Sequence, residues 1–370
     1  MVYGEMVGQN GNHGKMNFNK TFHNKKVFLT GYTGFKGTWM TIWLEMLGAK
    51  VKGYALKPET PSLFNFVKDQ LKIESIISDI RDRKKLEEEI LAFQPDFIFH
   101  LAAQPLVRES YKIPVETFEV NVMGTANLLD AVRLLKKECV VVIVTTDKVY
   151  KNNEFGKPFK EEDPLGGHDP YSSSKAAAEI ITESYRLSFF NPKEYSKHKK
   201  SIATARAGNV IGGGDYAEDR IVPDIFRALS KSQIINVRNP KAIRPWQHVL
   251  EPLSGYLSLA SAMKKEPQKY ATAFNFGPKL KDVCTVEELV KHAIKTWGKG
   301  NYIIENQKNA PHEAGTLKLN IKKAKKELHW KPKWNSDVAI EKTINWYKGS
   351  LARGNDKFEL CLKDIEGYLK

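Results

Sequence analysis

The chain has 370 residues, 41% hydrophobic and 27% charged, as in a globular protein with material for one large domain or two ordinary ones. No apolar run is long enough to cross a bilayer and the first twenty residues lack a secretory signal, so we predict a cytoplasmic protein without a membrane partner. Its 58 Lys and Arg against 43 Asp and Glu leave a net charge of +15. Because these residues are scattered through amphipathic stretches, they favour a solvated basic face and an anionic small substrate over nucleic acid. Three widely spaced cysteines predict neither a disulfide framework nor a metal site.

Strands and helices are expected to alternate after a Gly-, Asn- and His-rich flexible tail at residues 1–23. The expected strands are 25–31, 50–56, 73–79, 96–103 and 140–146, and the expected helices are 34–49, 82–94 and 115–135. This alternation predicts an α/β fold, a Rossmann-like doubly wound parallel sheet with helices on both faces.

The alternation loosens after a Gly- and Asp-rich loop at residues 212–220. A helix is expected at 221–231, a strand at 233–238, and a helix at 285–298 that opens with a capping box of Thr285 and Glu288. We therefore predict a larger domain from 24–208 and 233–262, and a smaller α/β substrate-binding lobe from 209–232 and 263–370.

The first strand ends in "GYTGFKG", with glycines at 31, 34 and 37. Between a strand and a helix, such glycines let the backbone approach a pyrophosphate, which the helix amino terminus attracts. The loop therefore predicts a dinucleotide site. The acid that usually binds the adenosine ribose is missing, because Leu56 and Lys57 stand at the end of the second strand, so chemistry alone leaves NAD or NADP open. Asp79 either meets the adenine amine or caps the following helix.

The stretch "VVVIVTTDKVY", residues 140–150, places Thr146, Asp147 and Lys148 directly after a buried strand. They form either a solvent-exposed strand end or part of a site at the carboxyl edge of the sheet. Downstream, Tyr171 and Lys175 are four residues apart at the start of a helix. That spacing puts both on one face, where an ammonium can lower the pKa of the phenol and make it a base, although such pairs also occur by chance.

Together these segments resemble the extended short-chain dehydrogenase/reductase family. The motifs are "TGYTGFKG", "HLAAQ", "VNVMGTANLLDA", "TTDKVY", "YSSSK" and "RAGNVIGGGD". The resemblance implies Tyr171 and Lys175 as the catalytic pair, Thr146 as their hydroxyl partner, Asn121 near the active site, and NAD as cofactor. The implied cofactor-binding residues are Gly31, Thr33, Gly34, Phe35, Gly37, Asp79, Ile80, Leu101, Ala102, Ala103, Tyr171 and Lys175.

The Asp147-Lys148 pair resembles the nucleotide-sugar 4,6-dehydratases, and segments such as "IRPWQHVLEPLSGY" resemble those that act on CDP-glucose. This implies oxidation at C4, loss of water across C5 and C6, and return of hydride to C6, as an early step toward deoxysugars of a surface polysaccharide such as O-antigen. Asp147 is then the acid for the C6 hydroxyl. The base for C5 is Lys148, which must be neutral to act, or a water molecule.

The expected substrate-binding residues are Gln104, Asn121, Asn209, Arg220, Arg244 and His312. Trp246 is either a core residue or a ligand contact.

Helices 115–135 and 171–187 are apolar on more than one face, which in this family predicts a homodimer or homotetramer. The alternatives are a dehydratase for UDP- or dTDP-sugars, a 4-epimerase, or a basic nucleic-acid-binding protein on the same scaffold.

Overall fold

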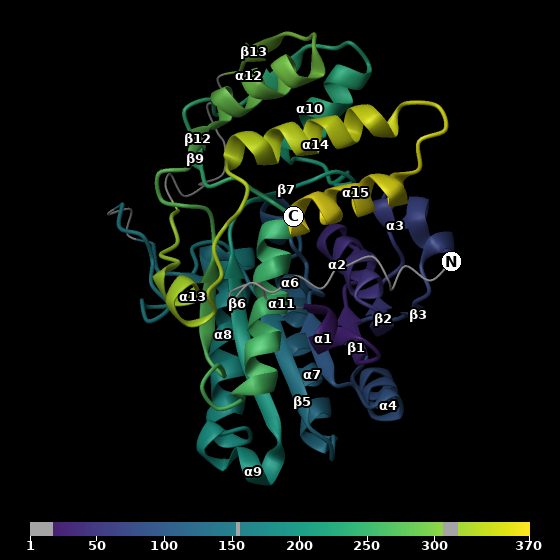
Figure 1. Cartoon of the computed structure of the whole chain (residues 1–370). Coiled ribbons are helices and arrows are strands. Elements are labelled where there is room, and N and C mark those ends of the chain that lie inside the picture. Colours follow the sequence, from purple (N-terminus) through teal and green to yellow (C-terminus); the bar gives the residue numbers. More distant parts are fainter. Residues whose placement is uncertain (1–17, 153–155, 306–316) are drawn as a thin grey trace.

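A computed structural model describes residues 18–152, 156–305 and 317–370. Its centre is a seven-stranded parallel sheet in the order β11-β6-β5-β4-β1-β2-β3 (Figure 1). This is the doubly wound order, so the predicted fold class is confirmed. The strands are β1 (Lys26–Thr30), β2 (Lys50–Ala55), β3 (Glu74–Ile77), β4 (Phe97–His100), β5 (Cys139–Val144), β6 (Lys200–Ala207) and β11 (Ala273–Phe276).

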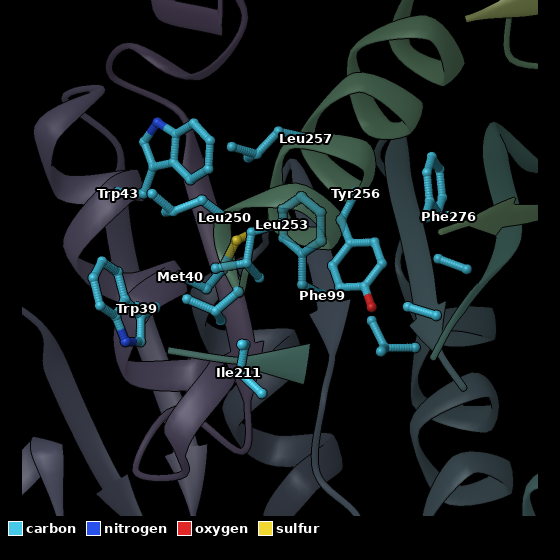
Figure 2. Close-up of a cluster of buried hydrophobic side chains, with 14 of the residues drawn as sticks. Trp39, Met40, Trp43, Phe99, Ile211, Leu250, Leu253, Tyr256, Leu257 and Phe276 are labelled. Carbon is cyan, nitrogen blue, oxygen red and sulfur yellow. The ribbon is translucent and has the colours of Figure 1, made fainter. Parts of the chain in front are cut away.

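Both faces of the sheet are covered, as a continuous run of apolar residues such as Cys139–Val144 requires. One face packs against α2 (Phe35–Met46) and α11 (Leu250–Lys265), and the other against α4 (Arg83–Phe93), α7 (Gly124–Leu134) and α8 (Pro170–Ser188). Helix α15 (Lys357–Leu369) packs against α2, α3 (Leu63–Val67) and α14 (Ser336–Ser350). Figure 2 shows the first layer, where Trp39 and Trp43 of α2 lie near Leu250 and Leu253 of α11.

A smaller lobe lies beside the sheet (Figure 1). It contains the helices α10 (Ile221–Ser230), α12 (Val286–Trp297) and α14 (Ser336–Ser350), and the strand pairs β8 (Ile235–Val237) with β13 (Tyr302–Ile304) and β9 (Ile243–Arg244) with β12 (Cys284–Thr285). The pair β7 (Val210–Ile211) and β10 (Gln247–His248) leads into and out of it. The capping box of Thr285 and Glu288 opens α12 as expected.

The domain boundaries predicted from sequence need three corrections. Strand β8 pairs with β13 in the lobe and does not return to the main sheet, whereas β11 is the edge strand of the main sheet and not part of the lobe. The tail also ends earlier than residue 23, because α1 (Phe18–Phe22) buries two phenylalanines four residues apart. The Phe22 ring lies 4.9 Å from that of Phe97, so this helix belongs to the core.

The expected helix over 115–135 is divided into α6 (Pro114–Phe118), a π-helical turn η3 (Glu119–Met123) and α7. The remaining helices are α3 (Leu63–Val67), η2 (Lys68–Gln70), α5 (Val107–Lys112), η4 (Asp147–Val149), η5 (Pro192–Glu194), α9 (Tyr195–His198) and α13 (Lys322–Glu327). Among the helices that the structure describes, none combines the length and apolarity needed to span a membrane.

Candidate active site

A cavity of about 1270 Å³ opens at the carboxyl ends of the central strands, between the sheet and the lobe. Its walls include Gly31 after β1, Ala102 after β4, Thr146 after β5 and Asn209 after β6. Open α/β sheets bind ligands at this edge. A site for one small ligand measures roughly 300–1,000 Å³, so the cavity has room for two.

The glycine loop forms one wall of the cavity. Gly31 has φ +73°, and a Cβ there would lie 2.7 Å from the Ala102 amide nitrogen. A Cβ on Gly37 would lie 2.0 Å from the Gly31 carbonyl oxygen, whereas one on Gly34 would meet only that oxygen at 3.4 Å. The loop is therefore tight against β4 and α2 but open at Gly34, where α2 begins without a side-chain cap. The free amides of this helix start fit a pyrophosphate.

All twelve residues expected to bind the cofactor line this cavity. The Asp79 carboxylate is held by Arg81, whose Nη2 lies 2.7 Å from Oδ2. The alternative in which Asp79 caps the next helix is wrong, because Asp82 caps α4 by accepting from the Lys85 amide at 3.0 Å.

The Asp147 carboxylate is buried at the end of β5, which excludes the alternative of a solvent-exposed strand end. The Thr146 hydroxyl donates to Asp147 Oδ1 at 3.1 Å and accepts from the Lys148 amide at 3.4 Å. A Cβ on Gly208 would lie 2.5 Å from Asp147 Oδ2, so only glycine leaves room for this carboxylate. Lys148 is half-buried in the cavity wall.

Tyr171 and Lys175 enter the same cavity from the first turns of α8, which Asp169 opens with a capping box. Burial raises the pKa of Tyr171 to about 12, while a hydrogen bond with Thr146 lowers it. The expected lowering by Lys175 is not found, because the Lys175 Nζ donates to the Val144 carbonyl at 3.1 Å. Burial lowers the pKa of Lys175 to about 8, against the opposing charge of Glu179.

Behind these residues lies a buried network that the sequence analysis missed. The Glu179 carboxylate, on α8, accepts from Arg206 Nε at 3.0 Å and Nη2 at 2.9 Å, from Thr145 Oγ1 at 2.5 Å and from Thr204 Oγ1 at 2.6 Å. Burial would raise the pKa of Glu179, but Arg206 and the two hydroxyls outweigh it and keep the pKa below its usual range. The network joins the end of β5, β6 and α8, next to Thr146 and Lys175.

Of the six residues expected to bind substrate, three line the cavity, one lies outside the described residues, and two lie away from the cavity wall. Asn209, Arg220 and Arg244 line the cavity, and the Arg220 guanidinium pairs with Asp215 at 2.9 Å. His312 lies outside the described residues. Trp246, which the sequence left as core or ligand contact, is buried in the core at the cavity wall.

The expectation for Gln104 and Asn121 needs correction, because neither lines the cavity. The Asn121 side chain accepts from the Gln104 amide at 2.8 Å and donates to Ser174 Oγ at 2.8 Å. The Gln104 side chain donates to Thr117 Oγ1 at 2.9 Å and accepts from the Leu106 amide at 2.5 Å. These amides hold the loop after β4 against α8.

Comparison with known proteins connects this geometry to a family. The model of a family described as GDP-mannose 4,6 dehydratase matches residues 28–343. The chain is also 46% identical over 349 residues to a CDP-glucose 4,6-dehydratase of Salmonella typhimurium, and the match covers 94% of this chain and 97% of that one.

Two solved structures show the same fold. A dTDP-glucose 4,6-dehydratase of Bacillus anthracis in complex with NAD has a TM-score of 0.69 and 24% identity, covering 88% of this chain and 96% of the other. A UDP-glucuronic acid 4-epimerase of Bacillus cereus, in complex with its sugar nucleotide and NAD, has a TM-score of 0.74 and 20% identity, covering 87% and 99%. Dehydratases and epimerases thus share this architecture.

Proposed function

This chain belongs to the GDP-mannose 4,6-dehydratase family, and we propose that it removes water from CDP-glucose to give CDP-4-keto-6-deoxyglucose. The observation that carries the reaction is the buried Asp147 carboxylate, hydrogen-bonded to Thr146 in the cavity that Tyr171 and Lys175 also line. A site that only oxidises a hydroxyl group needs no acid for a leaving group, whereas a site that eliminates a hydroxyl group needs one. The CDP-glucose 4,6-dehydratase relative supports the choice of substrate.

The cofactor of this reaction is NAD, and the residues present fit it. The glycine loop opens toward the cavity at Gly34, and Asp79 and Ile80 line the cavity beyond β3, where the adenosine end would lie. When bound, NAD supplies the hydride acceptor for C4 and later the hydride donor for C6.

Tyr171 acts on the 4-hydroxyl of the hexose. The Tyr171 phenolate takes the hydroxyl proton as C4 becomes a ketone. The hydrogen bond with the Thr146 hydroxyl stabilises the phenolate oxygen. Lys175, which lines the same cavity, binds the cofactor ribose.

Asp147 and Lys148 perform the elimination. The new C4 ketone acidifies the hydrogen on C5, which Lys148, half-buried beside Asp147, removes directly or through a water molecule. For this step Asp147 must be present as the carboxylic acid: it gives its proton to the departing C6 hydroxyl, which leaves as water, and becomes a carboxylate. Arg220, Arg244 and Asn209, on the lobe side of the cavity, bind the diphosphate, since guanidinium groups match phosphate oxygens.

The test is to incubate the purified chain with CDP-, dTDP- or UDP-glucose, with and without added NAD, and to follow product mass. We expect CDP-glucose to lose one water. Loss of water from another nucleotide sugar, or formation of a 4-epimer with unchanged mass, would contradict the proposed substrate or the proposed reaction, respectively.

We also propose that two copies of the chain pair through α6, α7 and α8. Exposed apolar side chains gather on these helices and the adjoining η3 turn, at Val115, Phe118, Met123, Leu134, Ile180 and Leu187. Helix α8 packs beside both α6 and α7, so these residues share one side of the molecule. Apolar surface concentrated in this way is typical of a protein interface, here in a homodimer or homotetramer.

Replacing Leu187, which is 60% exposed, with glutamate should dissociate this assembly. A charge in a paired apolar face must be desolvated, so we expect Leu187→Glu to elute as a monomer in size-exclusion chromatography with light scattering. The matched control is Leu351→Glu, since Leu351 is 53% exposed at the end of α14. A wild-type monomer, or equal dissociation by both variants, would contradict the proposed interface.

We also propose that the protein acts in the cytoplasm and in deoxysugar synthesis, such as that of O-antigen. The three cysteines are free thiols, as in proteins of reducing compartments. A 4-keto-6-deoxy sugar is an electrophile, and enzymes that reduce, aminate or epimerise it would consume the product.

A further inference from the structure

The Gly- and Asp-rich loop at residues 212–220 runs from β7 to α10 and ends at Arg220, one of the residues proposed to bind the diphosphate. Every residue of this loop except Gly213 lines the cavity. The conformation of the loop therefore decides where the Arg220 guanidinium lies relative to a bound nucleotide sugar.

The inner end of the loop is fixed by close packing. A Cβ on Gly213 would lie 1.9 Å from the Trp346 ring, and the Gly213 carbonyl accepts from Trp39 Nε1 at 2.9 Å. The next residue, Gly214, has φ +83° and lies against Leu63. The three side chains that hold this end belong to α14, α2 and α3 and are all buried, so the inner end is rigid.

The outer end of the loop is held by charge. The Asp219 carboxylate oxygen Oδ1 accepts from Arg108 Nη1 at 3.1 Å and from Arg238 Nη1 at 2.9 Å. Arg238 follows β8 of the lobe, whereas Arg108 belongs to α5, which follows β4 of the main sheet. Arg108 and Asp219 both line the cavity. Their ion pair therefore connects the sheet side of the cavity to the lobe side.

The two ends of the loop are held with different strength. The side chains of Arg108 and Asp219 are 34% and 49% exposed, so solvent screens their attraction. An exposed ion pair breaks more readily than buried packing, so the outer end is the part of the loop that opens first. Asp219 directly precedes Arg220, and the backbone of Arg220 is therefore freed when Asp219 leaves α5.

We propose that Asp219 is a positioning residue for the nucleotide sugar: its ion pair with Arg108 closes the loop on the ligand, holds Arg220 at the diphosphate, and opens when the ligand leaves. This inference rests on the proposed function for the identity of the ligand. The charge of Asp219 makes the role testable. A carboxylate repels a diphosphate, so Asp219 retains the ligand only through its pair with Arg108.

The test measures the rate at which CDP dissociates from the immobilised full chain, by surface plasmon resonance. We expect Asp219→Asn to speed release about two- to fivefold, the effect of losing one exposed ion pair, although it removes a charge that repels the ligand. Asparagine tolerates the left-handed backbone of this position, at φ +59°. Arg108→Met should speed release to the same degree. The double variant should release CDP no faster than either single variant, because both substitutions break the same pair.

The matched control is Arg83→Met, which breaks an ion pair of 2.7 Å with Asp130 outside the cavity and should leave CDP release unchanged. Slower or unchanged release from Asp219→Asn would overturn the inference, because a carboxylate that only repels the ligand gives that result. Effects that multiply in the double variant would also overturn it, since Arg108 and Asp219 would then act separately.

Thermal unfolding separates positioning from stability. Because the pair of Arg108 with Asp219 is screened, the melting temperature should be the same in both single variants as in the unsubstituted chain. A fall in melting temperature that accompanies faster release would assign the pair a structural role instead. The proposed function is judged separately, by turnover of the unsubstituted chain. If that chain converts a different nucleotide sugar, the nucleotide of that sugar replaces CDP in these measurements.

Discussion

Asp147→Asn is expected to lower the rate of water release from CDP-glucose by about 10²–10⁴-fold, the usual contribution of a general acid. The amide has no acidic proton for the departing hydroxyl, yet its oxygen can still accept from Thr146, as Oδ1 does now at 3.1 Å. Tyr171 and Lys175 are unchanged, so oxidation at C4 should continue. The variant should therefore form the 4-keto hexose, detected by mass spectrometry after borohydride trapping, without releasing water.

Two comparisons make this result specific to Asp147. Tyr171→Phe should abolish both oxidation and water release, because it removes the group that acts first. Asp163→Asn, a carboxylate in a turn outside the cavity that accepts from the Lys160 amide at 2.7 Å, should leave both unchanged. Water release by Asp147→Asn at the rate of the unsubstituted chain would show that another group is the acid.

The predicted residues that the structure brings together in the cavity are those whose geometry a single element fixes. Gly31 and Gly37 follow one strand, and the four-residue spacing of Tyr171 and Lys175 places both on one helical face. Strands β8 and β11 were assigned to the wrong domain because their partners, β13 and β6, are remote in sequence and nothing local distinguishes them.

The side chains that were placed wrongly from sequence also have partners that are remote in sequence. The Asn121 amide was expected to face substrate, but the π-helical turn η3 directs it to Gln104 and Ser174, contacts that no pattern reveals. Glu179 could have been found, because it continues the spacing of Tyr171 and Lys175 by another four residues. Its partner Arg206 lies on another element, and the alternation of β6 alone predicts only which face of the sheet it occupies.

Arg206→Met is expected to destabilise the protein by about 3–5 kcal/mol, the cost of breaking a buried ion pair by removing one partner. The side chains of Arg206 and Glu179 are only 5% and 3% exposed. Removing the guanidinium leaves the Glu179 carboxylate with the hydroxyls of Thr145 and Thr204 as its remaining donors, and Tyr150 loses a donor at 2.8 Å. Urea unfolding of the full chain measures the loss.

The double variant Glu179→Gln, Arg206→Met decides whether the unpaired charge causes that loss. With no carboxylate left to desolvate, it should be more stable than Arg206→Met alone. Lys269→Met, which breaks the exposed pair of Lys269 with Glu266, should leave the free energy of unfolding nearly unchanged, because solvent screens an exposed ion pair. If the double variant is as unstable as Arg206→Met, the guanidinium stabilises the protein through packing, and the unpaired Glu179 carboxylate is not the cause of the loss.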